Sequence, residues 1–152
     1  MNTPHEILLR PAVSYAVLKI FPFLLCSLLF LLLAWTLSPY FVFFSLSILA
    51  ASCYRLLFIR SFRYCITPEI IRISKGIFFK RTDQLEMYRI KDYIITQPLS
   101  LRIFGLMNLI LKGTDPENPV LNLNGIPQSN IVNTIRDHVQ EARHNNHIYE
   151  IN

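Results

Sequence analysis

A run of apolar residues from 20 to 59 constrains this chain more than any other feature. It holds no charged side chain except Arg55 and consists largely of Leu, Phe, Ile, Ala and Ser. At about 1.5 Å per residue, one helix of this length would be about twice as long as a hydrocarbon layer of ~30 Å is thick. Pro39 removes a backbone donor and disfavours a helical conformation at Ser38. The run therefore predicts two membrane-spanning helices, Ile20–Leu37 and Tyr40–Ile59, joined by a tight turn.

Basic residues flank this hairpin on both outer sides, and its turn has none. Arg10 and Lys19 precede the first span, and residues 55–91 carry nine Lys or Arg against three Asp or Glu. By the positive-inside rule, this distribution places both termini in the cytoplasm and the turn outside. For residues 1–19 a short interfacial helix and a disordered tail are open alternatives.

The remainder of the chain suffices for one small domain over residues 60–145, followed by a tail over residues 146–152. Beyond Arg63 the apolar residues recur at a period of two, which indicates strands. A helical turn is expected at Leu99–Phe104, before Gly105. The expected strands are Tyr64–Ile66, Ile70–Ser74, Ile77–Asp83, Arg89–Gln97, Met107–Lys112 and Val120–Asn124.

The strand at Arg89–Gln97 is expected to be half buried, with a bulge or twist. After Asn130, which is placed as a helix cap, Ile131, Ile135 and Val139 recur at helical spacing and predict an amphipathic helix. The fold class is therefore α+β: a transmembrane hairpin, then six or seven strands in a sandwich or small barrel that a C-terminal helix closes.

The sequence offers no candidate for catalysis or for a cofactor. Its histidines are His5, His138, His144 and His147, and the last two fall on a helix end that should fray, which makes a poor metal site. No GxGxxG or P-loop pattern occurs. The three cysteines, Cys26, Cys53 and Cys65, form no CxxC pair. We therefore expect no metal, no cofactor and no enzymatic activity.

Six basic residues are candidate contacts with the membrane surface. Arg55 lies about one turn before Arg60, so its side chain can extend to the interface as an anchor. Each juxtamembrane cation contributes about 1 kcal/mol of attraction to anionic headgroups. A solvated hairpin is the alternative for the residues that lie farther along the chain. The six are Arg55, Arg60, Arg63, Lys75, Lys80 and Arg81.

Aromatic residues interleave with this basic run, as they do in single-strand nucleic-acid platforms. Phe78, Phe79 and Tyr88 are the residues concerned. On alternating strands such side chains more often point into a core or an interface, so nucleic acid is not expected as a partner.

The order of elements resembles the bacterial pleckstrin-homology-like (PH-like) domain family, in its membrane-anchored form with two transmembrane helices. The likeness covers about residues 62–143. It is carried by Tyr64–Thr67, Ile70–Gly76, Arg89-Ile90 with Asp92, Gln97, Arg102-Ile103-Phe104-Gly105-Leu106, Asn108–Lys112 and the terminal helix.

This resemblance implies a split seven-stranded barrel on the cytoplasmic face of a bacterial inner membrane. It further implies a non-catalytic interaction or assembly module. The partners that we expect are the lipid bilayer, its anionic headgroups through the basic residues, and a membrane protein or a second copy. Thr67-Pro68-Glu69 is short and acidic where phosphoinositide-binding PH domains carry a long basic loop, so inositide recognition is not carried over. The alternative is an accessory subunit of a transporter or secretion complex that acts through its spans.

Overall fold

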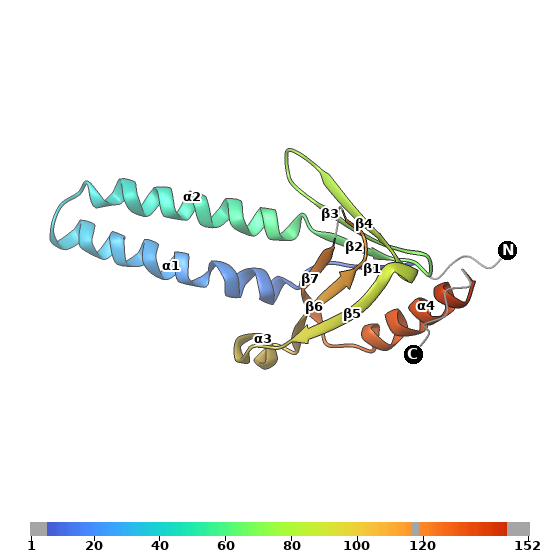
Figure 1. Cartoon of the computed structure of the whole chain (residues 1–152). Coiled ribbons are helices and arrows are strands. Elements are labelled where there is room, and N and C mark those ends of the chain that lie inside the picture. The colour runs from blue at the N-terminus through green and yellow to red at the C-terminus, as the bar shows by residue number, and fades with distance from the viewer. Residues whose placement is uncertain (1–5, 117–118, 146–152) are drawn as a thin grey trace.

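The computed structural model describes residues 6–116 and 119–145. A long helical hairpin projects from a domain of strands that carries one helix on its far side (Figure 1). The elements are β1 (Ile7–Leu9), α1 (Val13–Thr36), α2 (Phe41–Arg60), β2 (Arg63–Ile66), β3 (Ile70–Lys75), β4 (Arg81–Glu86), a 3-10 turn (Met87–Arg89), β5 (Ile90–Thr96), α3 (Leu99–Ile103), β6 (Leu106–Gly113), β7 (Val120–Pro127) and α4 (Ile131–Asn145).

Both helices of the hairpin are long and apolar enough to cross a membrane. Only 17% and 11% of their most hydrophobic stretches are buried, so most of their apolar surface is left exposed. The break at Ser38-Pro39 is confirmed, because it lies in the turn between α1 and α2. Midway along the pair, the hydroxyl group of Ser27 donates to the Ser45 carbonyl at 3.2 Å, and that of Ser45 donates to the Ser27 carbonyl at 3.0 Å.

The segment before the hairpin differs from both alternatives that the sequence left open. Ile7–Leu9 forms a strand, β1, which pairs antiparallel with β2. Helix α1 then begins at Val13, seven residues before the predicted start of the first span. The Ala12 amide donates to the Gly125 carbonyl at 2.9 Å, which ties the start of this helix to β7. Residues 1–5 and the predicted tail lie outside the described residues.

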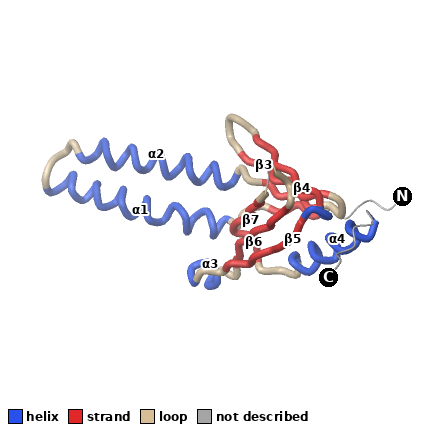
Figure 2. The backbone as a smooth tube through the Cα atoms, viewed as in Figure 1, coloured by secondary structure: helices blue, strands red, loops and turns tan. Residues whose placement is uncertain are grey.

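Seven antiparallel strands form two sheets, in the orders β1-β2-β3-β4 and β5-β6-β7. The α+β fold and its terminal helix are confirmed. Strand β1 adds a seventh strand to the six whose positions were predicted. Among the described residues no strand pairing joins the two sheets into a closed barrel. Helix α4 lies against the strands (Figure 2) and buries Ile131, Ile135 and Val139 in the common core, so the predicted apolar stripe is confirmed.

Two strand predictions need correction. The strand expected at Ile77–Asp83 begins only at Arg81, because the chain loops out after Gly76. A Cβ atom at Gly76 would lie 1.9 Å from the Phe79 carbonyl oxygen, so this tight loop requires glycine. Strand β5 is exposed at every residue except Ile90, and not half buried, so neither of its faces is covered beyond that residue. Its predicted bulge is confirmed, between Ile90 and Asp92.

Candidate functional site

A pocket rich in cations lies where α2 meets the first sheet. Three separate segments supply its lining: the residue after β1, the end of α2 with the start of β2, and the β3–β4 turn. The volume is about 190 Å³, enough for a small anionic group. We call this the basic pocket, and its lining residues are Arg10, Arg60, Ser61, Arg63, Ser74, Lys75, Gly76 and Lys80.

Four of the six predicted contact residues meet in the basic pocket: Arg60, Arg63, Lys75 and Lys80. Arg81 does not line it. The Arg81 guanidinium group lies 2.7 Å from the Asp83 carboxylate, and the Lys75 ammonium group lies 2.9 Å from the same carboxylate. Although burial raises the pKa of Asp83, hydrogen bonds from Lys75 and Arg81 outweigh that effect and hold the pKa below its ordinary value. Asp83 therefore stays ionised and offsets part of the local positive charge.

The loop between β3 and β4 extends the basic pocket with exposed aromatic side chains. Phe78 is 83% exposed and Phe79 is 92% exposed, whereas aromatic side chains of this size are normally buried. The loop projects from the first sheet on the side of the helical hairpin (Figure 2). Cations beside exposed aromatic rings are typical of a loop that contacts a lipid interface. We call Gly76–Lys80 the aromatic loop.

A second exposed apolar feature lies on the other side of the hairpin. Helix α3 leaves Leu99 77% and Ile103 78% exposed, and Phe104 follows it at 53%. Phe104 shares an apolar groove of about 470 Å³ with Val13 and other residues of the first turns of α1. Figure 1 shows α3 and the aromatic loop at opposite margins of the domain, both toward the hairpin.

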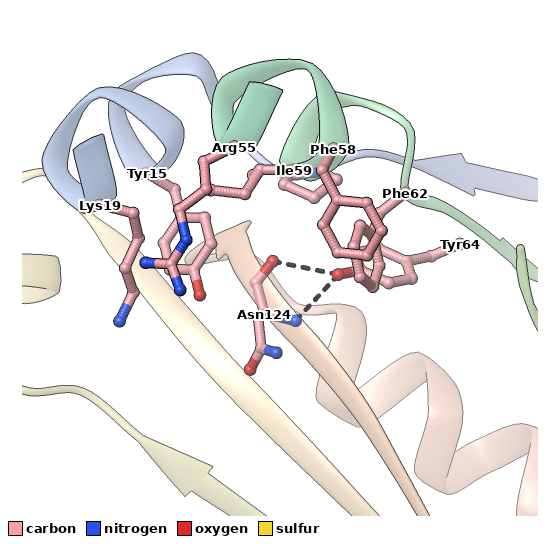
Figure 3. A pocket seen from close by; sticks show the side chains of 9 residues that line it. Tyr15, Lys19, Arg55, Phe58, Ile59, Phe62, Tyr64 and Asn124 are labelled. Carbon is pink, nitrogen blue, oxygen red and sulfur yellow. Dashed lines mark hydrogen bonds between the residues drawn. The ribbon is translucent and has the colours of Figure 1, made fainter. Parts of the chain in front are cut away.

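Arg55 belongs to a different place, the cleft between the hairpin and the domain (Figure 3). Its guanidinium group lies 4.9 Å from the centre of the Phe23 ring, while the Lys19 ammonium group lies 5.8 Å from the centre of the Tyr15 ring. The volume is about 300 Å³. We call this the junction cleft, and it is lined by Pro11, Tyr15, Lys19, Arg55, Phe58, Ile59, Phe62, Tyr64 and Asn124.

The floor of the junction cleft is held by a buried tyrosine. The Tyr64 hydroxyl group accepts a hydrogen bond from the Asn124 amide at 3.1 Å and lies 3.3 Å from the Asn124 carbonyl, to which it donates (Figure 3). Burial raises the pKa of Tyr64 to about 12, so the group stays protonated. The bond pair joins β2 of one sheet to β7 of the other and fixes the floor of the cleft.

Sequence reasoning missed Arg10 as a pocket residue and Tyr15 as a cleft residue. Arg10 reaches the basic pocket because β1 pairs with β2 across more than fifty intervening residues. Ile7-Leu8-Leu9 is too short to show strand alternation, so no local signal marks it. Within the described ranges 6–116 and 119–145, no three His, Cys, Asp or Glu side chains are placed to hold a metal ion.

The comparison with protein families adds one finding. A family model described as "Bacterial PH domain" matches residues 12–143, which include both hairpin helices as well as the strands and α4. Curated proteins and solved structures give no match. Because the matched region spans far more than half of the 152 residues, and its order of helices and strands is the one expected, this chain belongs to the bacterial PH domain family.

Proposed function

We propose that this protein is a non-catalytic interaction module of a bacterial inner membrane, whose two apolar helices span the bilayer and whose PH domain docks on the anionic cytoplasmic surface. The observation that carries the proposal is the basic pocket beside the aromatic loop. Five cations and two exposed phenylalanines gather at the end of α2, where a membrane-spanning helix leaves the bilayer. The domain is thereby presented to a protein partner in a fixed orientation.

Physical chemistry favours this arrangement over a solvated loop. If the exposed side chains of Phe78 and Phe79 enter the interface, their apolar surface is removed from water. This burial stabilises the docked state by about 25 cal/mol per Å². Cations nearby add about 1 kcal/mol each against anionic headgroups. Because the hairpin already holds the domain at the surface, little entropy remains to be lost on docking.

The test places a fluorophore on the aromatic loop of the full chain. A fragment without residues 1–61 would lack β1, so the full chain is reconstituted in nanodiscs with an environment-sensitive dye on Phe78→Cys and with the native cysteines replaced. We expect blue-shifted emission in discs with anionic lipid, and a return toward the emission in water as salt rises, because exposed charges are screened over about 8 to 10 Å at physiological ionic strength.

A charge-reversed variant and a matched control make the test specific. Arg63→Glu with Lys80→Glu, both at exposed residues of the basic pocket, should remove the blue shift. Arg136→Glu, at an exposed residue of α4, should leave it unchanged. Equal emission in neutral and anionic discs, or emission unaffected by the double substitution, would contradict docking and leave a protein as the ligand of this surface.

A further inference from the structure

We propose that the junction cleft binds one molecule of anionic phospholipid, with its phosphate held between Lys19 and Arg55. The inference rests on the proposed membrane insertion of the hairpin, but it uses none of the residues of the basic pocket. The proposed site would hold a single lipid between the hairpin and the domain, which differs from contact with the membrane surface in general.

The two cations reach the cleft from different helices. In Figure 3 the Lys19 ammonium group, the Arg55 guanidinium group and the Tyr15 hydroxyl group point to the same side of the cleft. Helices α1 and α2 contain no acidic residue, and no ion pair of Lys19 or Arg55 occurs within the described part of the chain. The site therefore presents two positive charges and a hydroxyl donor without a protein counter-charge.

The depth of the cations identifies the kind of anion that can reach them. At 1.5 Å per residue, Lys19 lies about 26 Å along α1 from Thr36, and Arg55 lies about 21 Å along α2 from Phe41. Across a hydrocarbon layer of ~30 Å, the Lys19 backbone lies about 4 Å and the Arg55 backbone about 9 Å inside the cytoplasmic edge, and long basic side chains extend from such depths to the headgroups. At that level the abundant anion is the phosphate of a phospholipid.

The walls of the cleft suit the remainder of such a molecule. Phe58 and Phe62 supply aromatic surface, with ring centres 5.4 Å apart in an edge-to-face arrangement. The Tyr64 hydroxyl group is occupied by Asn124, so this residue forms the floor and is not a ligand. A volume of about 300 Å³ admits a phosphate with its glycerol unit and leaves the acyl chains in the bilayer. Basic pockets between transmembrane helices on the cytoplasmic side commonly hold anionic headgroups.

The experiment measures bound lipid on the full chain. Protein purified in a mild detergent is titrated with phosphatidylglycerol or phosphatidylcholine, and lipid adducts are counted by native mass spectrometry. We expect one phosphatidylglycerol per chain and a preference over phosphatidylcholine. Lys19→Gln with Arg55→Gln should weaken phosphatidylglycerol binding by roughly tenfold or more, since two headgroup contacts are removed.

Matched variants separate this site from the proposed surface docking. Arg60→Gln with Arg63→Gln removes two cations from the basic pocket and should leave the tight adduct intact. Unchanged phosphatidylglycerol binding by the Lys19/Arg55 variant, or equal binding of both lipids by the native chain, would overturn the inference. Displacement of the lipid by millimolar inorganic phosphate would also overturn it, because it would show a site for free anion. Loop emission in nanodiscs reports on docking separately, so either proposal can fail alone.

Discussion

At the residue scale, the contact between the hairpin and the domain depends on a glycine. Gly125 has φ +66°, in the left-handed region, and a Cβ atom built there would lie 2.2 Å from the Tyr15 ring. The Gly125 amide also donates a hydrogen bond to the Asn108 side-chain oxygen at 2.9 Å. The Tyr15 ring of α1 thus packs directly on the backbone of β7, beside the junction cleft that it lines.

Gly125→Ala should lower the free energy of unfolding by more than the backbone strain of an alanine in the left-handed region accounts for. Gly105→Ala is the matched control, since Gly105 has φ +61° and no atom within 4 Å of the added methyl group. We expect a cost of about 1 kcal/mol for the control and a further ~1–3 kcal/mol at Gly125 from the clash with Tyr15. Pulse proteolysis in detergent across a urea series measures both free energies of unfolding, and equal values would show that Tyr15 moves aside freely.

At the element scale, the two ends of the molecule are held by different forces. Within the hairpin, Ser27 and Ser45 satisfy each other by hydrogen bonds, which in a membrane-spanning pair are worth about 1 kcal/mol. Both hydroxyl groups are therefore engaged within the hairpin. In the domain, burial of the α4 stripe closes the core between the two sheets.

Ile135→Asp should unfold the domain. Ile135 is 1% exposed within the core, so the carboxylate would be buried without a partner at a cost of at least ~3 kcal/mol, a large part of a small domain's stability. Gln140→Asp, at an exposed residue on the same helix, is the control. Trypsin digestion of the membrane-bound chain reads out the result: rapid loss of the domain is expected for Ile135→Asp alone, and protection equal to the control would show that α4 does not seal the core.

At the scale of the whole molecule, the features that were predictable are those with a local period. Hydrophobic spacing predicts the hairpin, the terminal helix and the positions of most strands. Pro39 predicts the turn between the two hairpin helices. Strand β1 and Arg10 were not predictable, because their places depend on pairing across the hairpin. Ile77–Phe79 resembles a strand by composition, yet no core faces it, and so it remains an exposed loop. The run of basic residues predicts the candidate membrane contacts, but the sequence does not show that they are divided between the junction cleft and the basic pocket. That division depends on how the chain folds.

The pairing of β1 with β2 also bears on how the chain crosses the bilayer. Residues 7–9 precede both helices and residues 64–66 follow them, yet their backbones are hydrogen-bonded in one sheet. A hairpin that inserts must therefore leave both flanking segments on one side of the membrane, independently of any charge rule. By the positive-inside rule, we predict that Arg10, Arg60 and Arg63 place these segments on the cytoplasmic side.

Cysteine labelling of intact cells tests this orientation. In a chain whose native cysteines are replaced, Ser38→Cys in the turn should react with an impermeant maleimide once the outer surface of the membrane is accessible. Gln140→Cys, at an exposed residue of α4, should react only after the membrane is permeabilised, because the maleimide does not reach the cytoplasm of a sealed cell. The charged domain should stay on that side, because moving its cations through hydrocarbon is costly. The reverse pattern would place the domain outside. Labelling of both cysteines in sealed cells would show that the apolar helices do not span the membrane, and the surface on which the aromatic loop docks would then have to be sought elsewhere.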